Sequence, residues 1–260
     1  MTRDIQNLTT KLAIACNERS LSSHLFRCKG SVIGRFLLLL CPKKYNDNYL
    51  TMYFNTSTFR TAILAGIAVG IAGWGYLVYN NIVGGVLFSF GLLTVVGYKL
   101  PLYTGTAGFI SLRDEQGRCS WLSAIGQLLF ILLGNITGCL LVSLLSRLSP
   151  LDLSSVAQRI LEGRLAIGPI RAGLLAIGCG FIMTTVVTFA REGKPLALLF
   201  GVPLFINCGF PHCLADAFYY LTVPVSYTMA HIAEVLLLYP CLVIGNFIGC
   251  NLYRFIAPAK

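Results

Sequence analysis

One histidine and one aspartate stand four positions apart inside an apolar run near the C-terminal end of the chain. The run reads NCGFPHCLAD (207–216) and contains His212 and Asp216. Histidine changes charge near neutral pH, so it can exchange a proton with the anion of a weak acid. On a helix the two side chains would share one face, where a carboxylate favours the charged imidazole and burial opposes it. The sequence leaves open which effect wins, and also whether His212 is only a packed, neutral side chain.

Hydropathy determines what surrounds this pair. The 260 residues are 56% hydrophobic and 12% charged, and the mean hydropathy is +0.74. A membrane helix needs about 20 mostly apolar residues. Six membrane spans are expected, because the first run divides near Gly84-Gly85 after Asn80-Asn81, and a kinked span surrounds residue 210. The apolar runs are 61–101, 121–146, 172–190, 195–215 and 235–253.

The net charge of +10 is unevenly distributed. Eight Lys and Arg lie between Arg3 and Lys44, and others flank the ends of spans. Basic residues are retained on the cytoplasmic side, so this pattern predicts a plasma-membrane protein with both termini in the cytoplasm, rather than a nucleic-acid partner. The link 148–171 should lie outside, although it carries Arg159 and Arg164.

The chain divides into two parts by composition. Residues 1–57 form a basic cytoplasmic segment, and residues 58–260 form a transmembrane channel domain. The apolar patch FLLLLC (36–41) is too short to span a bilayer and too far from the start for a signal peptide. Either it forms a cytoplasmic surface helix, or the native start lies near Met52. The ten cysteines contain no Cys-x-x-Cys pair, so packing is expected, with no metal or cofactor.

An internal repeat indicates the fold. LGNITGC (133–139) returns as IGNFIGC (244–250), and both copies hold a Gly-x-x-x-Gly spacing that lets membrane helices approach closely. The residues Asn135 and Asn246 offer hydrogen bonds between helices. LAGIAVG (64–70) is echoed by AGLLAIG (172–178), and the Ala-Gly pairs at 65–66 and 172–173 give an offset of 107. Three spans per copy predict an all-α integral membrane protein with an inverted 3+3 repeat, the plan of many transporters and channels.

Each copy also contains an interrupted helix. GYKLPLYTGTAG (97–108) breaks the second span, and NCGFPHCLAD (207–216) breaks the fifth. Proline and glycine oppose a continuous helix at both places. Broken backbone at membrane depth is tolerated only where it is buried in protein or lines a polar path. The two breaks are therefore expected to face each other across a pore.

These residues resemble a known family. The order of GGVLFSFGLL (84–93), LYTGT (102–106), GFPHCLADAF (209–218) and the two Gly-Asn signatures is similar to the formate/nitrite transporter family, over residues 58–256. The resemblance implies an aquaporin-like fold with six helices, assembled as a homopentamer with one pore per protomer.

The resemblance also implies a role for each matching position. His212 would be the central pore histidine, with Thr104 and Leu102 in the loop that breaks the second helix. Phe88 and Leu92 would line one hydrophobic constriction, and Phe205 the facing one. Arg164 matches a vestibule position where the family usually has lysine, and Asn207 opens the second break as a further pore residue. The chain departs from the family at Pro211 (usually Glu), Asp216 (usually Asn) and Gly180 (apparently Asn).

The expected function is transport of small monovalent anions of weak acids, namely formate, nitrite or hydrosulfide. Protons are a second partner, and their transfer is coupled to transport through the pore histidine His212. Protonating an acid of pKa about 4 at neutral pH costs about 4 kcal/mol. Well-placed donors and a positive vestibule can lower that barrier. The alternative is a neutral-solute channel for water or glycerol, although the paired Asn-Pro-Ala motifs of aquaporins are missing. An enzyme is not expected, because His212 with Asp216 is too small a polar cluster.

Overall fold

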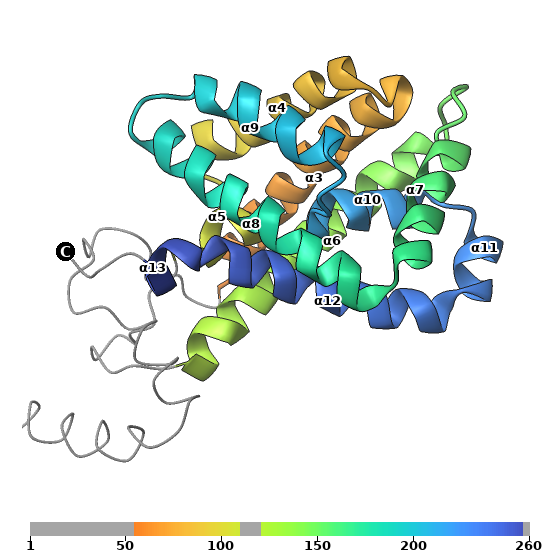
Figure 1. Ribbon diagram of the computed structural model, residues 1–260. Coiled ribbons are helices and arrows are strands. Elements are labelled where there is room, and N and C mark those ends of the chain that lie inside the picture. The colour runs from red at the N-terminus through yellow and green to blue at the C-terminus, as the bar shows by residue number, and fades with distance from the viewer. Residues whose placement is uncertain (1–54, 110–120, 257–260) are drawn as a thin grey trace, which may run out of the picture.

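The computed structural model describes residues 55–109 and 121–256, and all regular secondary structure within these ranges is helical (Figure 1). The basic N-terminal segment up to residue 54, the patch 36–41 and the last four residues lie outside the described part of the chain. The longer helices are α3 (Thr56–Tyr79), α4 (Ile82–Gly97), α6 (Trp121–Ser146), α7 (Ser154–Ile167), α8 (Pro169–Arg191), α9 (Leu196–Asn207), α10 (Cys213–Thr222) and α12 (Ile232–Cys250). Three short helices are α5 (Tyr103–Ala107), α11 (Val225–Ala230) and α13 (Leu252–Ile256).

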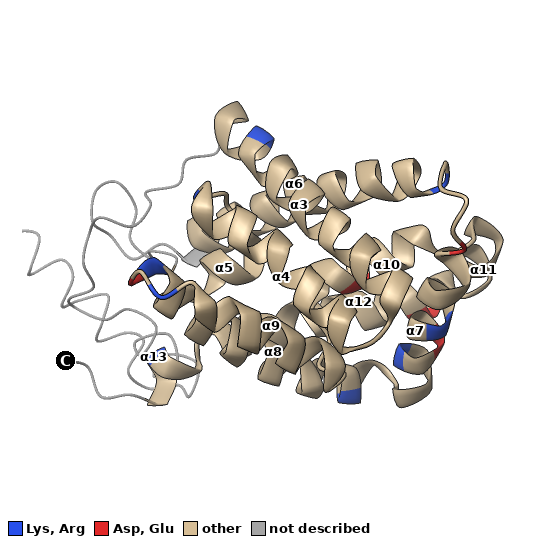
Figure 2. Cartoon of the chain, turned by 90° about the horizontal axis from the view of Figure 1, so that it is seen from above, with Lys and Arg blue, Asp and Glu red and all other residues tan. Residues whose placement is uncertain are grey.

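Four of the described helices, α3, α6, α8 and α12, are long and apolar enough to cross a membrane, and α4 and α9 are shorter apolar helices. Charged residues gather mostly toward the two ends of the bundle, and its middle is almost uncharged (Figure 2). The first apolar run divides at the two asparagines rather than at the glycine pair. Asn80 ends α3 with φ 45°, and the Asn81 side chain caps α4 by accepting from the backbone N–H groups of Val83 and Gly84.

Helices α3 and α6 pack against each other, as do α8 and α12, while α4 lies beside α9 (Figure 1). The first two pairs cross with their backbones in contact. A methyl group on Gly66 would collide with the Asn135 carbonyl, and one on Gly180 would collide with the Asn246 carbonyl. Only glycine permits these approaches, so its helix-weakening effect is offset by close packing.

These matched contacts define the register of the repeat. Gly66 meets the first Gly-Asn signature as Gly180 meets the second, so the equivalent positions in α3 and α8 are 114 residues apart. The offset of 107 expected from the sequence paired Gly66 with Gly173 instead, and it was wrong by seven residues. Seven residues are almost two helical turns and return to the same helix face, so small residues recur at both registers.

Candidate functional site

Both broken helices are built in the same way. Helix α4 ends where the Leu100 N–H bonds to the Val95 carbonyl at 2.8 Å, with Lys99 at φ 53°. Helix α9 ends where the Phe210 N–H bonds to the Phe205 carbonyl at 3.0 Å, with Gly209 at φ 76°. This left-handed residue is a common way to end a helix.

After each left-handed residue come one further residue, a proline and one extended residue, and then a new helix begins. The extended residue is Leu102 before α5 and His212 before α10. Leu102 and His212 therefore occupy equivalent positions in the two halves. Pro211, a departure from the family pattern, is the counterpart of Pro101 and gives the second break the same construction as the first.

The asparagines of the repeated signature hold the breaks in shape. The Asn135 side chain accepts from the Tyr103 N–H at 2.9 Å and donates to the carbonyls of Ala62 and Pro101, at 2.8 and 2.9 Å. Asn135 is fully buried, and its bonds to the Tyr103 N–H and the Pro101 carbonyl satisfy backbone groups that no helix partner serves.

Asn246 makes the same three bonds in the second half. It accepts from the Cys213 N–H at 2.8 Å and donates to the carbonyls of Ala176 and Pro211, at 2.8 and 3.0 Å. Each asparagine thus ties the break of its own half to the first helix of that half.

The cysteine that closes each signature contacts the break of the opposite half. The Cys139 thiol lies 3.7 Å from the Leu214 carbonyl of α10, and the Cys250 thiol lies 3.4 Å from the Thr104 carbonyl of α5. Both cysteines are buried. Sequence reasoning assigned them to packing only, although their fixed place in each signature was visible.

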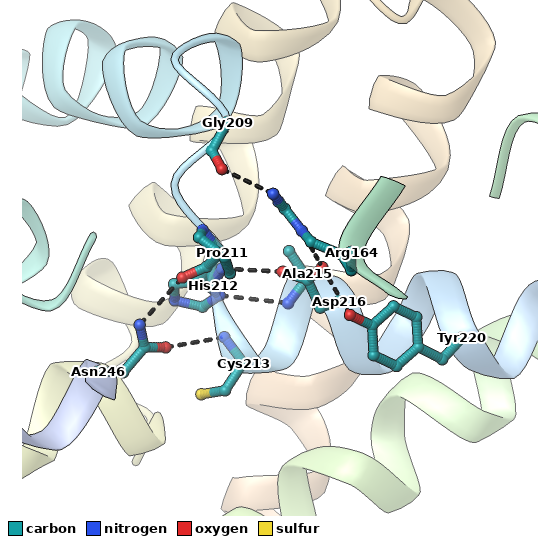
Figure 3. A network of polar contacts seen from close by, with 9 residues as sticks. All are labelled: Arg164, Gly209, Pro211, His212, Cys213, Ala215, Asp216, Tyr220 and Asn246. Atoms are coloured by element: carbon teal, nitrogen blue, oxygen red, sulfur yellow. Dashed lines mark hydrogen bonds and ion pairs between the residues drawn. The ribbon is translucent and has the colours of Figure 1, made fainter. Parts of the chain in front are cut away.

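The two breaks meet where Thr104 and His212 touch. The Thr104 Oγ1 lies 2.9 Å from His212 Nε2, and both side chains are at most 1% exposed. His212 Nδ1 accepts from the Ala215 N–H at 3.2 Å and so caps α10 (Figure 3). Because Nδ1 acts as an acceptor, the neutral ring carries its proton on Nε2 and donates it to Thr104. In that tautomer the threonine hydroxyl hydrogen is not used in this contact.

Aromatic rings cover this pair. The Phe205 ring stacks on the His212 ring, with the ring centroids 5.3 Å apart. The Phe88 and Phe205 rings form a T-shaped contact, with their centroids 6.1 Å apart. The two phenylalanines expected in facing constrictions therefore lie together. Leu92 and Leu102 are buried in the same apolar core.

Asp216 does not bond to the imidazole, in contrast to one reading of its spacing from His212. Its carboxylate accepts from the His212 backbone N–H at 2.9 Å and from the Tyr220 hydroxyl at 3.2 Å. It also pairs with Arg164, whose Nε lies 3.0 Å from Oδ1 and whose Nη1 donates to the Gly209 carbonyl at 2.7 Å (Figure 3). The expected vestibule cation is thus joined to the histidine-bearing break.

Two further positions complete the site. Asn207 donates to the Pro203 carbonyl one turn back in its own helix, so its visible bond supports α9. Arg191, which sequence reasoning did not single out, donates to the Gly105 carbonyl at 3.0 Å and lies 4.1 Å over the Phe109 ring. Among the described residues no group of three or more His, Cys, Asp or Glu is placed to hold a metal ion.

Comparison with known proteins fits this architecture. The profile described as "Formate/nitrite transporter" matches residues 49–257. The chain is 24% identical to the formate channel FocB of Escherichia coli K12, covering 75% of this chain and 79% of that protein. It is 27% identical to FocA of the same organism, over 62% of this chain and 64% of FocA.

Two solved structures share the fold. A pentameric formate channel with formate bound superposes with a TM-score of 0.64 at 23% identity, over 75% of this chain and 92% of that one. A channel described as an FNT family ion channel gives a TM-score of 0.63 at 23% identity, over 77% and 88% of the two chains. This protein is therefore a multi-pass helical membrane protein, and it belongs to the formate/nitrite transporter family.

Proposed function

We propose that the protein is a channel for small monovalent anions of weak acids, with formate as the first candidate and nitrite and hydrosulfide as others. The observation that carries this proposal is the contact between Thr104 and His212, which joins the two broken helices inside an apolar core. An ionisable side chain inside a membrane span is energetically costly, so its presence indicates a functional site. Family membership and the names of the relatives point to the same substrate class.

The proposed architecture has six spans, formed by α3, α4 with α5, α6, α8, α9 with α10, and α12. The second half enters the membrane upside down because each half has three spans. Both termini lie in the cytoplasm, and the protein is a homopentamer with one pore in each protomer. The pentameric formate channel that shares the fold supports this assembly.

The tautomer of His212 suggests how a proton is handled. The neutral imidazole donates through Nε2 and accepts through Nδ1, so it holds no readily released proton. We infer that the Thr104 hydroxyl hydrogen binds the anion and that water in the vestibule supplies the proton. The rings of Phe88 and Phe205 form a dry constriction that only a neutral acid crosses easily.

The test is flux of radiolabelled formate, nitrite, hydrosulfide and glycerol into proteoliposomes. His212→Ala should abolish or redirect anion flux while the pentamer remains intact. His231→Ala is the matched control, because that histidine ends α11 at a half-exposed position and should keep full flux. Wild-type flux should rise as external pH falls toward the substrate's pKa, since the neutral acid consumes a proton on entry.

Two results would contradict the proposal. Flux of His212→Ala at the wild-type rate and with the wild-type pH dependence would make the histidine structural. Rapid glycerol flux without any anion flux in the wild-type protein would instead favour the neutral-solute channel.

A further inference from the structure

The positive charge of Arg164 is balanced by the negative charge of Asp216, which is more deeply buried. Arg164 comes from α7, which links the two halves, and its side chain is 16% exposed. Asp216 comes from the first turn of α10 and is 1% exposed. At 3.0 Å between Nε and Oδ1, the two ionised groups form a pair with no net charge.

Hydrogen bonds hold both Arg164 and Asp216 in place. Asp216 accepts three hydrogen bonds, one of them from the backbone N–H of His212, and Arg164 also binds the Gly209 carbonyl. A buried carboxylate of this kind is stable only when it is paired and hydrogen-bonded. The position of the negative charge, beside the pore histidine, is therefore fixed by the fold.

We propose that Asp216 is a specificity-determining residue, which cancels the field of Arg164 so that the vestibule does not concentrate anions. This proposal rests on the function proposed above, and it concerns how strongly the pore entrance attracts anions. The resemblance places lysine at position 164, glutamate at 211 and asparagine at 216, where this chain has arginine, proline and aspartate. The negative charge therefore lies at position 216 instead of 211. Arginine and aspartate together carry no net charge, so the approach of an anion depends only weakly on electrostatic attraction.

Arg164 can still donate hydrogen bonds in this arrangement. A guanidinium carries five N–H donors. One bonds to Asp216 and one to Gly209, so three further N–H donors lie outside these two bonds. Arg164 therefore offers hydrogen bonds to a substrate at the vestibule while its long-range field is cancelled.

The decisive variant is Asp216→Asn, tested by formate flux in proteoliposomes at about 0.05 M and about 0.5 M potassium gluconate, with sucrose balancing the osmolarity. An amide keeps the shape but has only one acceptor oxygen. With that oxygen toward the His212 backbone N–H the break should hold, although the bond from Arg164 is lost. Without the negative charge of Asp216, the positive charge of Arg164 is no longer cancelled and attracts formate. The half-saturation concentration for formate should therefore fall about three- to tenfold at low salt. High salt should raise the half-saturation concentration most of the way back to the wild-type value, because the Debye length falls from about 14 Å to about 4 Å.

Arg164→Gln should shift the same measurement the other way, since it leaves the carboxylate uncompensated. Its half-saturation concentration should rise at low salt, and added salt should lower it. This opposite sign keeps the proposal testable if Asp216→Asn fails to fold.

Asp152→Asn is the matched control. Asp152 is exposed at the start of α7, and hydrogen bonds from Ser155 and Ser154 lower the pKa of its carboxyl, so the variant removes one negative charge from the same helix region. It should keep the wild-type half-saturation concentration and the wild-type weak salt dependence.

The outcomes separate this proposal from the function on which it rests. A wild-type protein without formate flux would overturn the function. If the wild-type protein conducts formate and Asp216→Asn keeps the same half-saturation concentration and salt dependence, the charge cancellation is wrong. An intact Asp216→Asn pentamer without flux would also overturn it, because Asp216 would then act by shaping the break.

Discussion

Asn246 gives the sharpest test of how the repeated signature builds the pore. Asn246→Ala removes a fully buried side chain that bonds to Cys213, Pro211 and Ala176. The Ala176 carbonyl lies inside α8 and keeps its helical bond. The Cys213 N–H and the Pro211 carbonyl flank His212 outside any helical ladder, so they lose their partner.

The size of the effect follows from those two groups. Leaving one buried donor or acceptor without a partner costs about 1–3 kcal/mol, whereas hydrogen bonds in membrane proteins average about 0.6 kcal/mol. We therefore expect a loss of about 2–4 kcal/mol in the free energy of unfolding. Denaturation of the purified protein in mixed micelles, followed by circular dichroism, measures this loss.

Asn135→Ala is the matched variant, because Asn135 makes the same three kinds of bond in the first half. The two variants should lose similar stability. Their formate flux should differ, since Asn246 brackets His212 and Asn135 brackets Leu102. Asn246→Ala should lose at least tenfold in flux per folded protein molecule, and Asn135→Ala should lose less. Full stability together with full flux in Asn246→Ala would refute this account of the break.

Three further predictions concern single contacts. Thr104→Val should lower formate flux less severely than His212→Ala, because it removes one hydrogen-bonding group and keeps the shape; equal losses would contradict this. Gly180→Ala should force α8 and α12 apart and lower the thermal midpoint of the protein, whereas Gly163→Ala, with open space around its Cβ position, should raise it slightly. Cys250→Ala should weaken the link to the Thr104 carbonyl, so flux should fall, and Cys250→Ser should restore part of it.

Several features of the fold and site could be read from the sequence because they depend on local chemistry. Apolar length predicts membrane helices, and proline with glycine predicts the two breaks, since each acts on its own segment of backbone. The repeated signature also marked Asn135 and Asn246 as interhelical groups. The family followed from those motifs in order, and the profile match confirms it.

Other features depend on which distant segments meet. The pairing of Arg164 with Asp216 joins residues 52 positions apart, and the contact of Thr104 with His212 joins residues 108 apart. The hydropathy of either segment does not specify these partners. The register of the repeat was missed for a related reason, since a shift of seven residues keeps the same helix face.

The sequence by itself determined that this chain enters the membrane, breaks two helices and repeats one signature, because length, hydropathy and backbone restrictions act residue by residue. Only the tertiary structure decided what the breaks face. It placed Leu102 and His212 at equivalent positions, brought Phe88 against Phe205, and gave Arg164 a buried counter-charge. Those outcomes depend on how closely glycine-lined helices cross, and backbone contact between helices sets that distance.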